Sequence, residues 1–337
     1  MKKIAIRLIG AVLILGSLAI AWAGMELYRF KQTPLNVSEA GQLITVKPGS
    51  NLSRIAHELE ARGVIDSALY LRLWSRWLDQ ATAIHAGEYE LTPGMLPLAL
   101  LENMVNGKVI QYSLTIIEGW SFKQLMAALS QHEKIRTTLQ GLNNEEIMAR
   151  LGHEGQHPEG RFLPDTYHFP AGTSDANFLK RAYEAMAQRL AAEWQQREEN
   201  LPLKTPYEAL ILASIIEKET AVASERAEIA GVFVRRLQRN MRLQTDPTVI
   251  YGMGDAFDGN IRRRDLRRDT PYNTYTRKGL PPTPIAMPSG EAIHAALHPK
   301  PGSSLYFVAK GDGSHYFSGT IDEHNRAVRR YQLNKSR

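Results

Sequence analysis

The stretch Ala209-Leu-Ile-Leu-Ala-Ser-Ile-Ile216 leads directly into an ionisable residue, Glu217. Its apolar residues cover every face of a helix, which predicts a helix that is buried all round. Burial beside apolar side chains favours the neutral form of a carboxyl group, and a general acid needs that form. On helical spacing Glu217 shares a face with Leu210, Ala213 and Ser214, and the two small residues predict room for a ligand. Glu217 is therefore a candidate catalytic residue.

Spacing alone leaves two other interpretations of this segment open. In the first, Glu217 is a structural carboxylate that pairs with an arginine further along the chain: Arg226, Arg235 or Arg236. In the second, Glu219 is the functional acid, because its helical neighbours are larger and more apolar. These neighbours are Leu212, Ile215 and Ile216.

The N-terminal residues predict a membrane anchor. Lys2, Lys3 and Arg7 precede an uncharged stretch from Leu8 to Met25. Eighteen helical residues span about 27 Å, which is just enough for a hydrocarbon core of about 30 Å. Positive charge before the span places the N-terminus in the cytoplasm and the rest of the chain outside. A cleaved signal peptide is the alternative, since Ala21-Trp-Ala23 resembles a cleavage site, but the apolar stretch exceeds the usual length.

Composition limits the chemistry of the exported part. The chain has 337 residues and no cysteine, which excludes a disulfide framework, thiol catalysis and a cysteine zinc site. The net charge of +6 and the arginine clusters at 235–239 and 262–268 raise the question of nucleic acid. Export and the interrupting Asp265 argue against that partner. Attraction to an anionic envelope polymer or lipid is the better interpretation.

Turn and capping signals divide the chain into segments of an α+β fold. A strand near Ile44, two helices and a returning strand at 87–91 predict a β-α-α-β unit. The later part alternates long helices with loops and ends in a hairpin around Gly311-Asp-Gly313. The predicted division comprises a cytoplasmic N-terminus (1–7), a transmembrane helix (8–25), a linker (26–42), a small subdomain (43–92) and a larger α+β domain (93–337).

Two histidine patterns suggest metal binding, but the sequence favours neither. His153-Glu-Gly-Gln-His157 matches the H-E-x-x-H motif of zinc proteases, which requires a helix. Four glycines and prolines within ten residues make a helix there improbable. His294 and His298 have helical spacing, but no carboxylate follows His294. The sequence therefore predicts no metal and no cofactor.

Polar and aromatic loop residues near the Glu217 helix predict a sugar-binding cleft. Amide and hydroxyl groups suit sugar hydroxyls and N-acetyl groups, and aromatic faces suit C–H surfaces. The candidate substrate-binding residues come from two short loops: Gln244, Asp246, Tyr272, Asn273 and Tyr275. A third loop, Glu159–Tyr167, has a similar composition, although its Asp165 is equally suited to capping a turn.

Several motifs resemble known families. Thr45-Val-x-x-Gly-Ser-x-Leu-x-x-Ile-Ala56 resembles the start of a LysM module, which binds N-acetylglucosamine polymers. Leu212–Thr220, Leu243–Tyr251 and Pro271–Pro282, in this order, resemble the YceG-like family of endolytic murein transglycosylases. The resemblance covers roughly residues 43 to 335. It departs from the family pattern at Thr283, at Met287 and at an additional Ser289 before Gly290, which concerns the shape of that loop.

The resemblance implies a function for the whole chain. In that family the first Glu of the Glu-Lys-Glu triplet is the catalytic acid, and this position is Glu217, on a lysozyme-like catalytic helix. The implied reaction cleaves peptidoglycan strands between N-acetylmuramic acid and N-acetylglucosamine and leaves 1,6-anhydro ends. Implied partners are glycan strands and peptidoglycan synthases, and the implied location is the inner membrane with a periplasmic catalytic domain. Two alternatives remain: a hydrolytic muramidase with Asp246 as second carboxylate, and a non-catalytic peptidoglycan tether.

Overall fold

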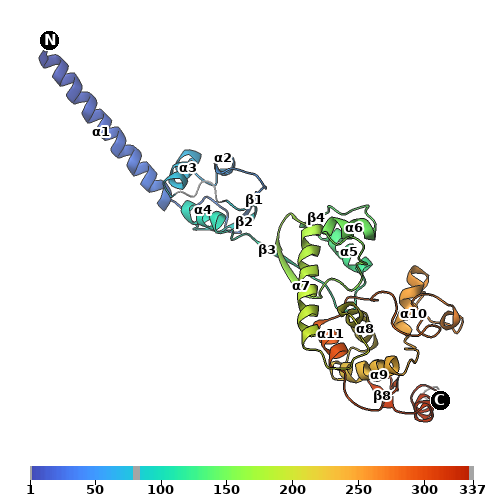
Figure 1. Cartoon of the computed structure of the whole chain (residues 1–337). Helices are drawn as coiled ribbons and strands as arrows, with labels where there is room; N and C mark the ends of the chain where they lie inside the picture. The colour runs from blue at the N-terminus through green and yellow to red at the C-terminus, as the bar shows by residue number, and fades with distance from the viewer. Residues whose placement is uncertain (1, 79–83, 334–337) are drawn as a thin grey trace. The chain divides into compact units, whose positions relative to one another are not determined.

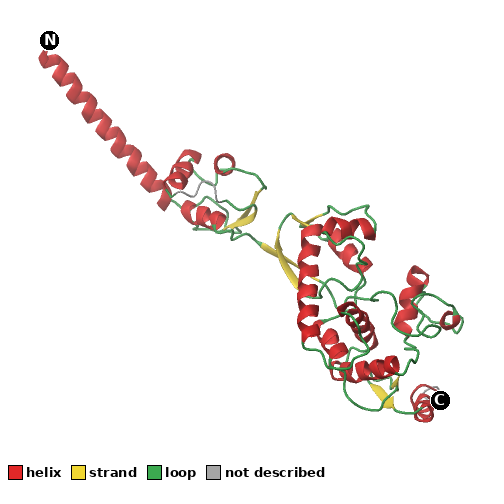
Figure 2. Cartoon of the chain, viewed as in Figure 1, coloured by secondary structure: helices red, strands yellow, loops and turns green. Residues whose placement is uncertain are grey.

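The computed structural model of the chain describes residues 2–78 and 84–333. Helices and strands are mixed along the chain, as the predicted α+β class requires (Figures 1 and 2). The contacts separate two compact units: residues 1–112 with 169–172, and residues 113–168 with 173–337. The first residue of the predicted cytoplasmic segment and the last four of the predicted 93–337 domain lie outside the described residues.

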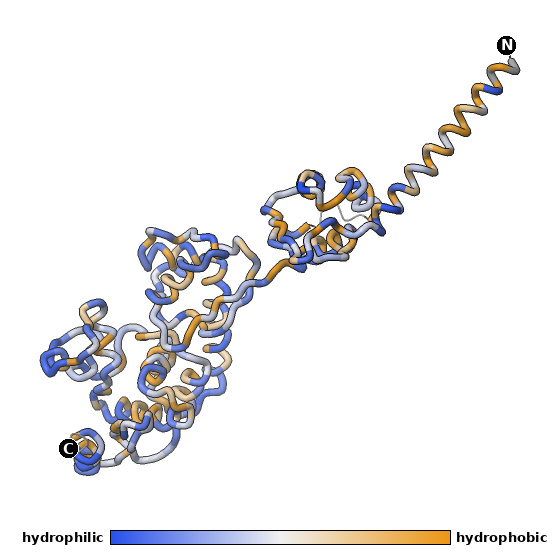
Figure 3. The backbone as a smooth tube through the Cα atoms, turned by 180° about the vertical axis from the view of Figure 1, so that it is seen from behind, coloured by the Kyte–Doolittle hydropathy of each residue, from blue (hydrophilic) through white to orange (hydrophobic). Residues whose placement is uncertain are grey.

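The N-terminal helix α1 (Lys2–Gln32) is long and apolar enough to cross a membrane. Its segment Ile6–Gln32 contains an 18-residue window with a mean hydropathy of 2.2 and includes the predicted span 8–25 (Figure 3). The predicted linker over 26–42 is helical as far as Gln32. This extension packs within the first unit, since Phe30 is buried and the Trp74 indole N–H donates to the Leu27 carbonyl at 3.0 Å.

The first unit contains the predicted order of strand, two helices and strand. Its elements are β1 (Gln42–Val46), α2 (Leu52–Ala61), α3 (Ala68–Trp77), β2 (Gly87–Leu91) and α4 (Pro97–Val105). β1 and β2 pair antiparallel, with Gln42 opposite Leu91 and Val46 opposite Gly87. Asn51 begins α2, because its side chain accepts a hydrogen bond from the Arg54 N–H.

Helix α4 belongs to the core of this first unit. Leu100, Leu101 and Met104 are buried in the same apolar cluster as Ile44 and Tyr89 of the strands. The observed unit therefore extends beyond residue 92, because α4 buries the apolar face that the small sheet leaves open. The functional division of the chain at residues 92 and 93 stays a prediction.

The second unit is mainly helical, and its strands form short two-stranded pairs. Its elements in chain order are β3 (Gln111–Thr115), α5 (Phe122–Gln131), β4 (Ile135–Arg136), α6 (Asn144–Leu151), β5 (Thr166–Pro170), β6 (Thr173–Ser174), α7 (Asp175–Gln195), α8 (Pro206–Glu219), α9 (Arg226–Gln238), α10 (Asp246–Met253), α11 (Gly290–Leu297), β7 (Tyr306–Ala309), β8 (His315–Ser318) and α12 (Ile321–Val328). β3 pairs with β5, β4 with β6 and β7 with β8. The division between the two units falls within β3 and β5.

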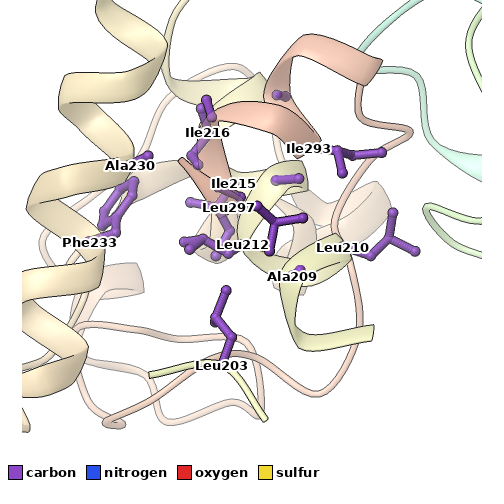
Figure 4. Close-up of a cluster of buried hydrophobic side chains, with 14 of the residues drawn as sticks. Leu203, Ala209, Leu210, Leu212, Ile215, Ile216, Ala230, Phe233, Ile293 and Leu297 are labelled. Atoms are coloured by element: carbon purple, nitrogen blue, oxygen red, sulfur yellow. The ribbon is translucent and has the colours of Figure 1, made fainter. Parts of the chain in front are cut away.

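Helix α8 lies at the centre of the second unit, as the apolar run predicts. Every residue from Ala209 to Ile216 is buried. Helices α7, α9 and α11 pack around it, and Figure 4 shows Phe233 of α9 and Ile293 and Leu297 of α11 beside its side chains. A helix that is apolar all round is stable only in such a core.

The predicted room for a ligand beside Ala213 and Ser214 is wrong. Both residues are fully buried, and the Ser214 hydroxyl accepts a hydrogen bond from the Ile285 N–H at 3.0 Å. The small side chains instead let the 284–289 loop and α11 approach α8 closely. Thr245 is the N-cap of α10, so Asp246 is the first residue of that helix.

Candidate functional site

A cleft of about 740 Å³ opens at the C-terminal end of α8. It is lined by residues from the end of β3 and the loop after it, from the 164–166 loop, from the last turn of α8 and from the start of α9. These residues are Thr115, Ile116, Ile117, Glu118, Gly119, Pro164, Asp165, Thr166, Glu217, Lys218, Glu219, Thr220, Ala221 and Arg226. The cleft therefore contains both candidate acids, Glu217 and Glu219.

Glu217 is held rigidly at one carboxyl oxygen. Its side chain is only 6% exposed. Oε2 accepts hydrogen bonds from the Ser289 N–H at 2.9 Å and from the Ser289 hydroxyl at 2.5 Å. Ser289 is also the N-cap of α11, and its hydroxyl oxygen accepts from the Ala292 N–H at 3.2 Å. Ser289 therefore fixes the orientation of the candidate acid.

Arg226 lies between two carboxylates. Its guanidinium is 3.7 Å from Glu217 Oε1 and 3.7 Å from Glu118 Oε2, and the side chain is 13% exposed. The predicted pairing of Glu217 with a downstream arginine is thus present with Arg226. Arg235 and Arg236 instead donate to backbone carbonyls, including those of Ser304 and Leu305.

Glu118 is a cleft residue that the sequence did not single out. Burial, then the charge of Glu217, raise the pKa of Glu118, and Arg226 lowers it. Two backbone hydrogen bonds join its loop to the 284–289 loop: the Gly119 N–H donates to the Met287 carbonyl at 2.9 Å, and the Met287 N–H donates to the Trp120 carbonyl at 2.7 Å. Lys218 of α8 donates to the Gly119 carbonyl at 3.2 Å. No spacing rule connects Glu118 with a helix a hundred residues later, so only the fold brings these carboxylates together.

Glu219 occupies a different environment in the same cleft. Burial raises its pKa to about 7, the Thr245 hydroxyl donates to Oε1 and lowers it, and the charge of Asp246 raises it. This is the desolvation that its apolar neighbours predict. Glu219 is therefore a carboxyl that can hold a proton near neutral pH.

The five predicted substrate-binding residues lie in two segments, 244–246 and 272–275, which the Gln244 N–H joins by donating to the Thr274 carbonyl at 3.2 Å, and Thr245 between them contacts Glu219. The Tyr275 hydroxyl donates to Asp246 Oδ1 at 2.6 Å, and Gln244 Oε1 accepts from Arg236 at 3.3 Å. The Tyr272 hydroxyl is 2.9 Å from the Thr283 hydroxyl. In the described part of the chain, none of the five is among the residues that line the Glu217 cleft.

The Asn273 side chain stabilises its own loop through hydrogen bonds. It is buried, and its side-chain amide donates to the carbonyls of Asp265, Leu266 and Arg268. Its Oδ1 accepts from the Tyr275 N–H at 2.9 Å. These contacts use the polar groups of the side chain, so Asn273 shapes the loop that presents Tyr275.

The H-E-x-x-H segment is not helical, as its glycines predict. α6 ends at Leu151, with Gly152 in the left-handed conformation, and His153 stacks on Tyr183 at 3.7 Å between ring centroids. His157 Nδ1 accepts a hydrogen bond from the Glu159 N–H at 3.2 Å. This segment therefore lacks the helical geometry that a zinc protease requires.

The Glu159–Tyr167 loop divides its two acids between two places. Asp165 lines the Glu217 cleft, and its Oδ1 accepts from the adjacent Thr166 N–H at 2.7 Å. Glu159 is buried elsewhere, where it accepts from the Phe122 N–H at 2.9 Å and from the Tyr251 hydroxyl at 3.1 Å. Burial raises the pKa of Glu159 to about 7.

The sequence profile of the YceG-like family matches residues 44–330 of this chain. The chain belongs to the YceG-like family. Among the relatives of known name, the endolytic murein transglycosylase of Bacillus subtilis (strain 168) is 32% identical in an alignment of 311 residues that covers 87% of this chain and 85% of that protein. A protein of the same name from Streptococcus pneumoniae (strain D39) is 28% identical, over 85% of this chain and 57% of its own length.

A solved YceG-like structure also resembles the chain. It is a crystal structure of a YceG-like protein from Listeria monocytogenes, with 29% sequence identity and a TM-score of 0.51. The match covers 86% of this chain and 99% of the other. The likeness therefore spans both compact units of this YceG-like chain.

Proposed function

We propose that this chain is an endolytic peptidoglycan lyase that cleaves glycan strands through Glu217. The YceG-like family and the names of the two relatives support a transglycosylase acting on murein. The geometry that carries the proposal is a nearly buried carboxyl at the end of α8, fixed at Oε2 by Ser289, with the opposite oxygen near Arg226 in a cleft.

In the proposed reaction Glu217 acts first as an acid and then as a base. It donates its proton to the glycosidic oxygen between N-acetylmuramic acid and N-acetylglucosamine, and the bond from that oxygen to C1 breaks. The C6 hydroxyl of the muramic residue attacks C1 and transfers its proton to Glu217. The products are a free 4-hydroxyl and a 1,6-anhydro end, and no water is consumed. One carboxyl suffices because the nucleophile, the C6 hydroxyl, belongs to the substrate. The enzyme has only to hold that hydroxyl close to C1.

The loop residues beside Glu219 are proposed to hold the sugar or to orient the acid. Gln244, Asp246, Tyr272 and Tyr275 supply amide, carboxylate and aromatic groups, and Asn273 stabilises the loop that carries the two tyrosines. The Asp246 carboxylate accepts from Tyr275, an arrangement that orients a side chain rather than one that activates water.

The whole chain is proposed to act at the outer face of a membrane. The apolar helix α1 and the positive-inside rule support the proposed location of the bulk of the chain in the periplasm, anchored to the inner membrane. The LysM-like subdomain is proposed to recognise glycan, and peptidoglycan synthases are proposed partners. In that place the enzyme would limit the length of growing strands.

Digestion of purified peptidoglycan tests the catalytic proposal. Wild-type protein should release fragments ending in 1,6-anhydro-muramic acid, identified by mass spectrometry, and Glu217→Gln should reduce the rate by at least about a thousandfold, since it removes the acid and the base. Glu154→Gln, which alters an exposed carboxyl, is the control. Full activity in Glu217→Gln would refute the assignment.

A hydrolytic muramidase is the second candidate, because a second carboxylate lies near Glu217. Hydrolysis uses one carboxyl as acid and another to activate water or attack C1. In this cleft Arg226 lies near both Glu118 and Glu217. Glu118 is therefore a better candidate for the second carboxylate than the predicted Asp246. Reducing ends without anhydro groups would identify the hydrolase, and binding without any cleavage would identify a peptidoglycan tether.

A further inference from the structure

The C-terminal ends of α7 and α11 bring together three metal-ligating side chains. Glu193 comes from α7, and His294 and His298 come from α11 and its C-cap. One ligand atom from each side chain lies within 4.8 Å of the other two, and this is the one such group of three in residues 2–78 and 84–333. The carboxylate that the sequence around His294 lacks is therefore supplied by another helix, a hundred residues earlier.

The contacts of Glu193 orient it as a ligand. Oε2 is 2.8 Å from His294 Nδ1, and Oε1 forms an ion pair with Arg189 at 3.0 Å. An outer partner on one oxygen of a ligating carboxylate is the usual way in which such a ligand is oriented. Glu193 is 13% exposed and His294 is 56% exposed, so the pair faces solvent on one side and is open to an incoming ion.

His298 lies between two backbone carbonyl oxygens. Its Nδ1 lies 3.1 Å from the His294 carbonyl oxygen, and its Nε2 lies 2.9 Å from the Gln196 carbonyl oxygen. A neutral imidazole has one N–H, so one of these nitrogens directs a lone pair toward an oxygen. When Nδ1–H donates to the His294 carbonyl, which is the outer contact that metal-bound histidines make, an ion at Nε2 would also contact the Gln196 carbonyl oxygen.

The backbone field at this place also favours a positive ion. Gln196 is the C-cap of α7 and His298 is the C-cap of α11, so the site lies where both helices end. The last carbonyls of a helix carry a partial negative charge, which stabilises a cation nearby. Two histidines and one carboxylate form a ligand set that suits zinc, with about 3.4 Å between ligand atoms at tetrahedral zinc. Rotation of the side chains from separations of up to 4.8 Å reaches that spacing.

We propose that Glu193, His294 and His298 form a binding site for a divalent zinc-like ion that links the ends of α7 and α11. Both helices pack against α8, and the N-cap of α11 is Ser289, which holds Glu217. The ion therefore acts as a structural clamp on the helix that orients the acid. The proposal is independent of the chemistry assigned to Glu217.

Calorimetric titration of the full chain in detergent with zinc chloride tests this site. The protein carries a tag without histidine and is first treated with chelator. We expect one equivalent of zinc to bind, and His294→Ala and Glu193→Gln each to weaken binding by at least about tenfold. A double variant, His153→Ala with His157→Ala, removes the other histidine pair and should bind zinc like the wild type.

Thermal unfolding provides a second measurement that does not depend on heats of binding. An ion that binds only the folded chain raises the unfolding temperature, and this rise should be absent in His294→Ala. Because His294 is exposed, its loss should leave the metal-free unfolding temperature nearly unchanged. Absence of zinc binding, or binding that persists in His294→Ala and is lost in the 153/157 variant, would overturn the proposal.

Discussion

At the scale of single residues, Ser289 is the contact that most directly controls Glu217. Its hydroxyl donates to Glu217 Oε2, and its N–H does the same. Ser289→Ala keeps the N–H but removes the hydroxyl. A hydrogen bond to a charged group contributes roughly 1.5–3 kcal/mol, so we expect kcat to fall by about tenfold or more while KM changes little.

The control for Ser289→Ala separates capping from catalysis. Ser289 also caps α11, and loss of an N-cap costs about 1 kcal/mol of stability. Thr320 is the N-cap of α12, outside the cleft, so Thr320→Ala should lose comparable stability and keep its activity. Equal activity losses in the two variants would assign the effect of Ser289 to folding alone.

Glu118 should lose its proton at lower pH when Glu217 is made neutral. Burial, then the negative charge of Glu217 across Arg226, raise the pKa of Glu118. Glu217→Gln removes that charge, so the pKa of Glu118 should fall, which an NMR titration of the carboxyl carbons measures. Glu154→Gln, which alters an exposed carboxyl, is the control and should leave the pKa of Glu118 in place. An unchanged or higher pKa of Glu118 in Glu217→Gln would contradict this coupling.

At the scale of elements, Glu159 connects two helices of the second unit. Oε1 accepts from the first N–H of α5, that of Phe122, and Oε2 accepts from Tyr251 of α10. Burial raises the pKa of Glu159 to about 7, whereas an unfolded Glu titrates near 4.3. The folded chain then holds a proton that the unfolded chain releases between about pH 4.3 and 7. This carboxyl therefore lowers stability as pH rises through that window.

Glu159→Gln should remove this part of the pH dependence. Relative to wild type, the variant should gain stability between pH 5 and pH 8, by up to about 3 kcal/mol. Urea unfolding at the two pH values measures the difference, and the similar contribution of Glu219 cancels because both proteins contain it. Equal stability differences at pH 5 and pH 8 would contradict the buried acid.

At the scale of the whole molecule, the apolar helix α1 predicts that the chain is held in a membrane. Leu15 and Leu18 are exposed on this apolar helix. Each arginine placed at the centre of a membrane span costs roughly 2.5–3.5 kcal/mol, so Leu15→Arg with Leu18→Arg should abolish carbonate-resistant pelleting with membranes. Leu69→Arg, at an exposed position of α3, should pellet like wild type.

The mass of the membrane-bound protein completes this test. An uncleaved anchor retains the residues before Ala23, whereas a processed signal peptide loses them. A mature chain that starts after Ala23 and is extracted from the membrane by carbonate would contradict the anchor and show that the N-terminal segment is a cleaved signal peptide.

Local sequence determined much of this protein. The apolar run determined α8 because burial on all sides is the only stable place for such a helix. Capping boxes at Ser121 and Thr320 determined where α5 and α12 begin, since the partner groups lie three residues apart. The glycines around His153 likewise excluded a helical zinc motif, and the N-terminal charges and apolar length indicated α1.

Only the tertiary structure decided which side chains meet. The partners of Glu217, which are Ser289 and Arg226 with Glu118 beyond it, come from three different segments, and Glu193 reaches His294 across about a hundred residues. The tertiary structure also fills the face of α8 beside Ser214, where the sequence predicted room for a ligand. The physical reason is that caps and periodic patterns act over one or two helical turns, whereas these contacts depend on how whole helices pack.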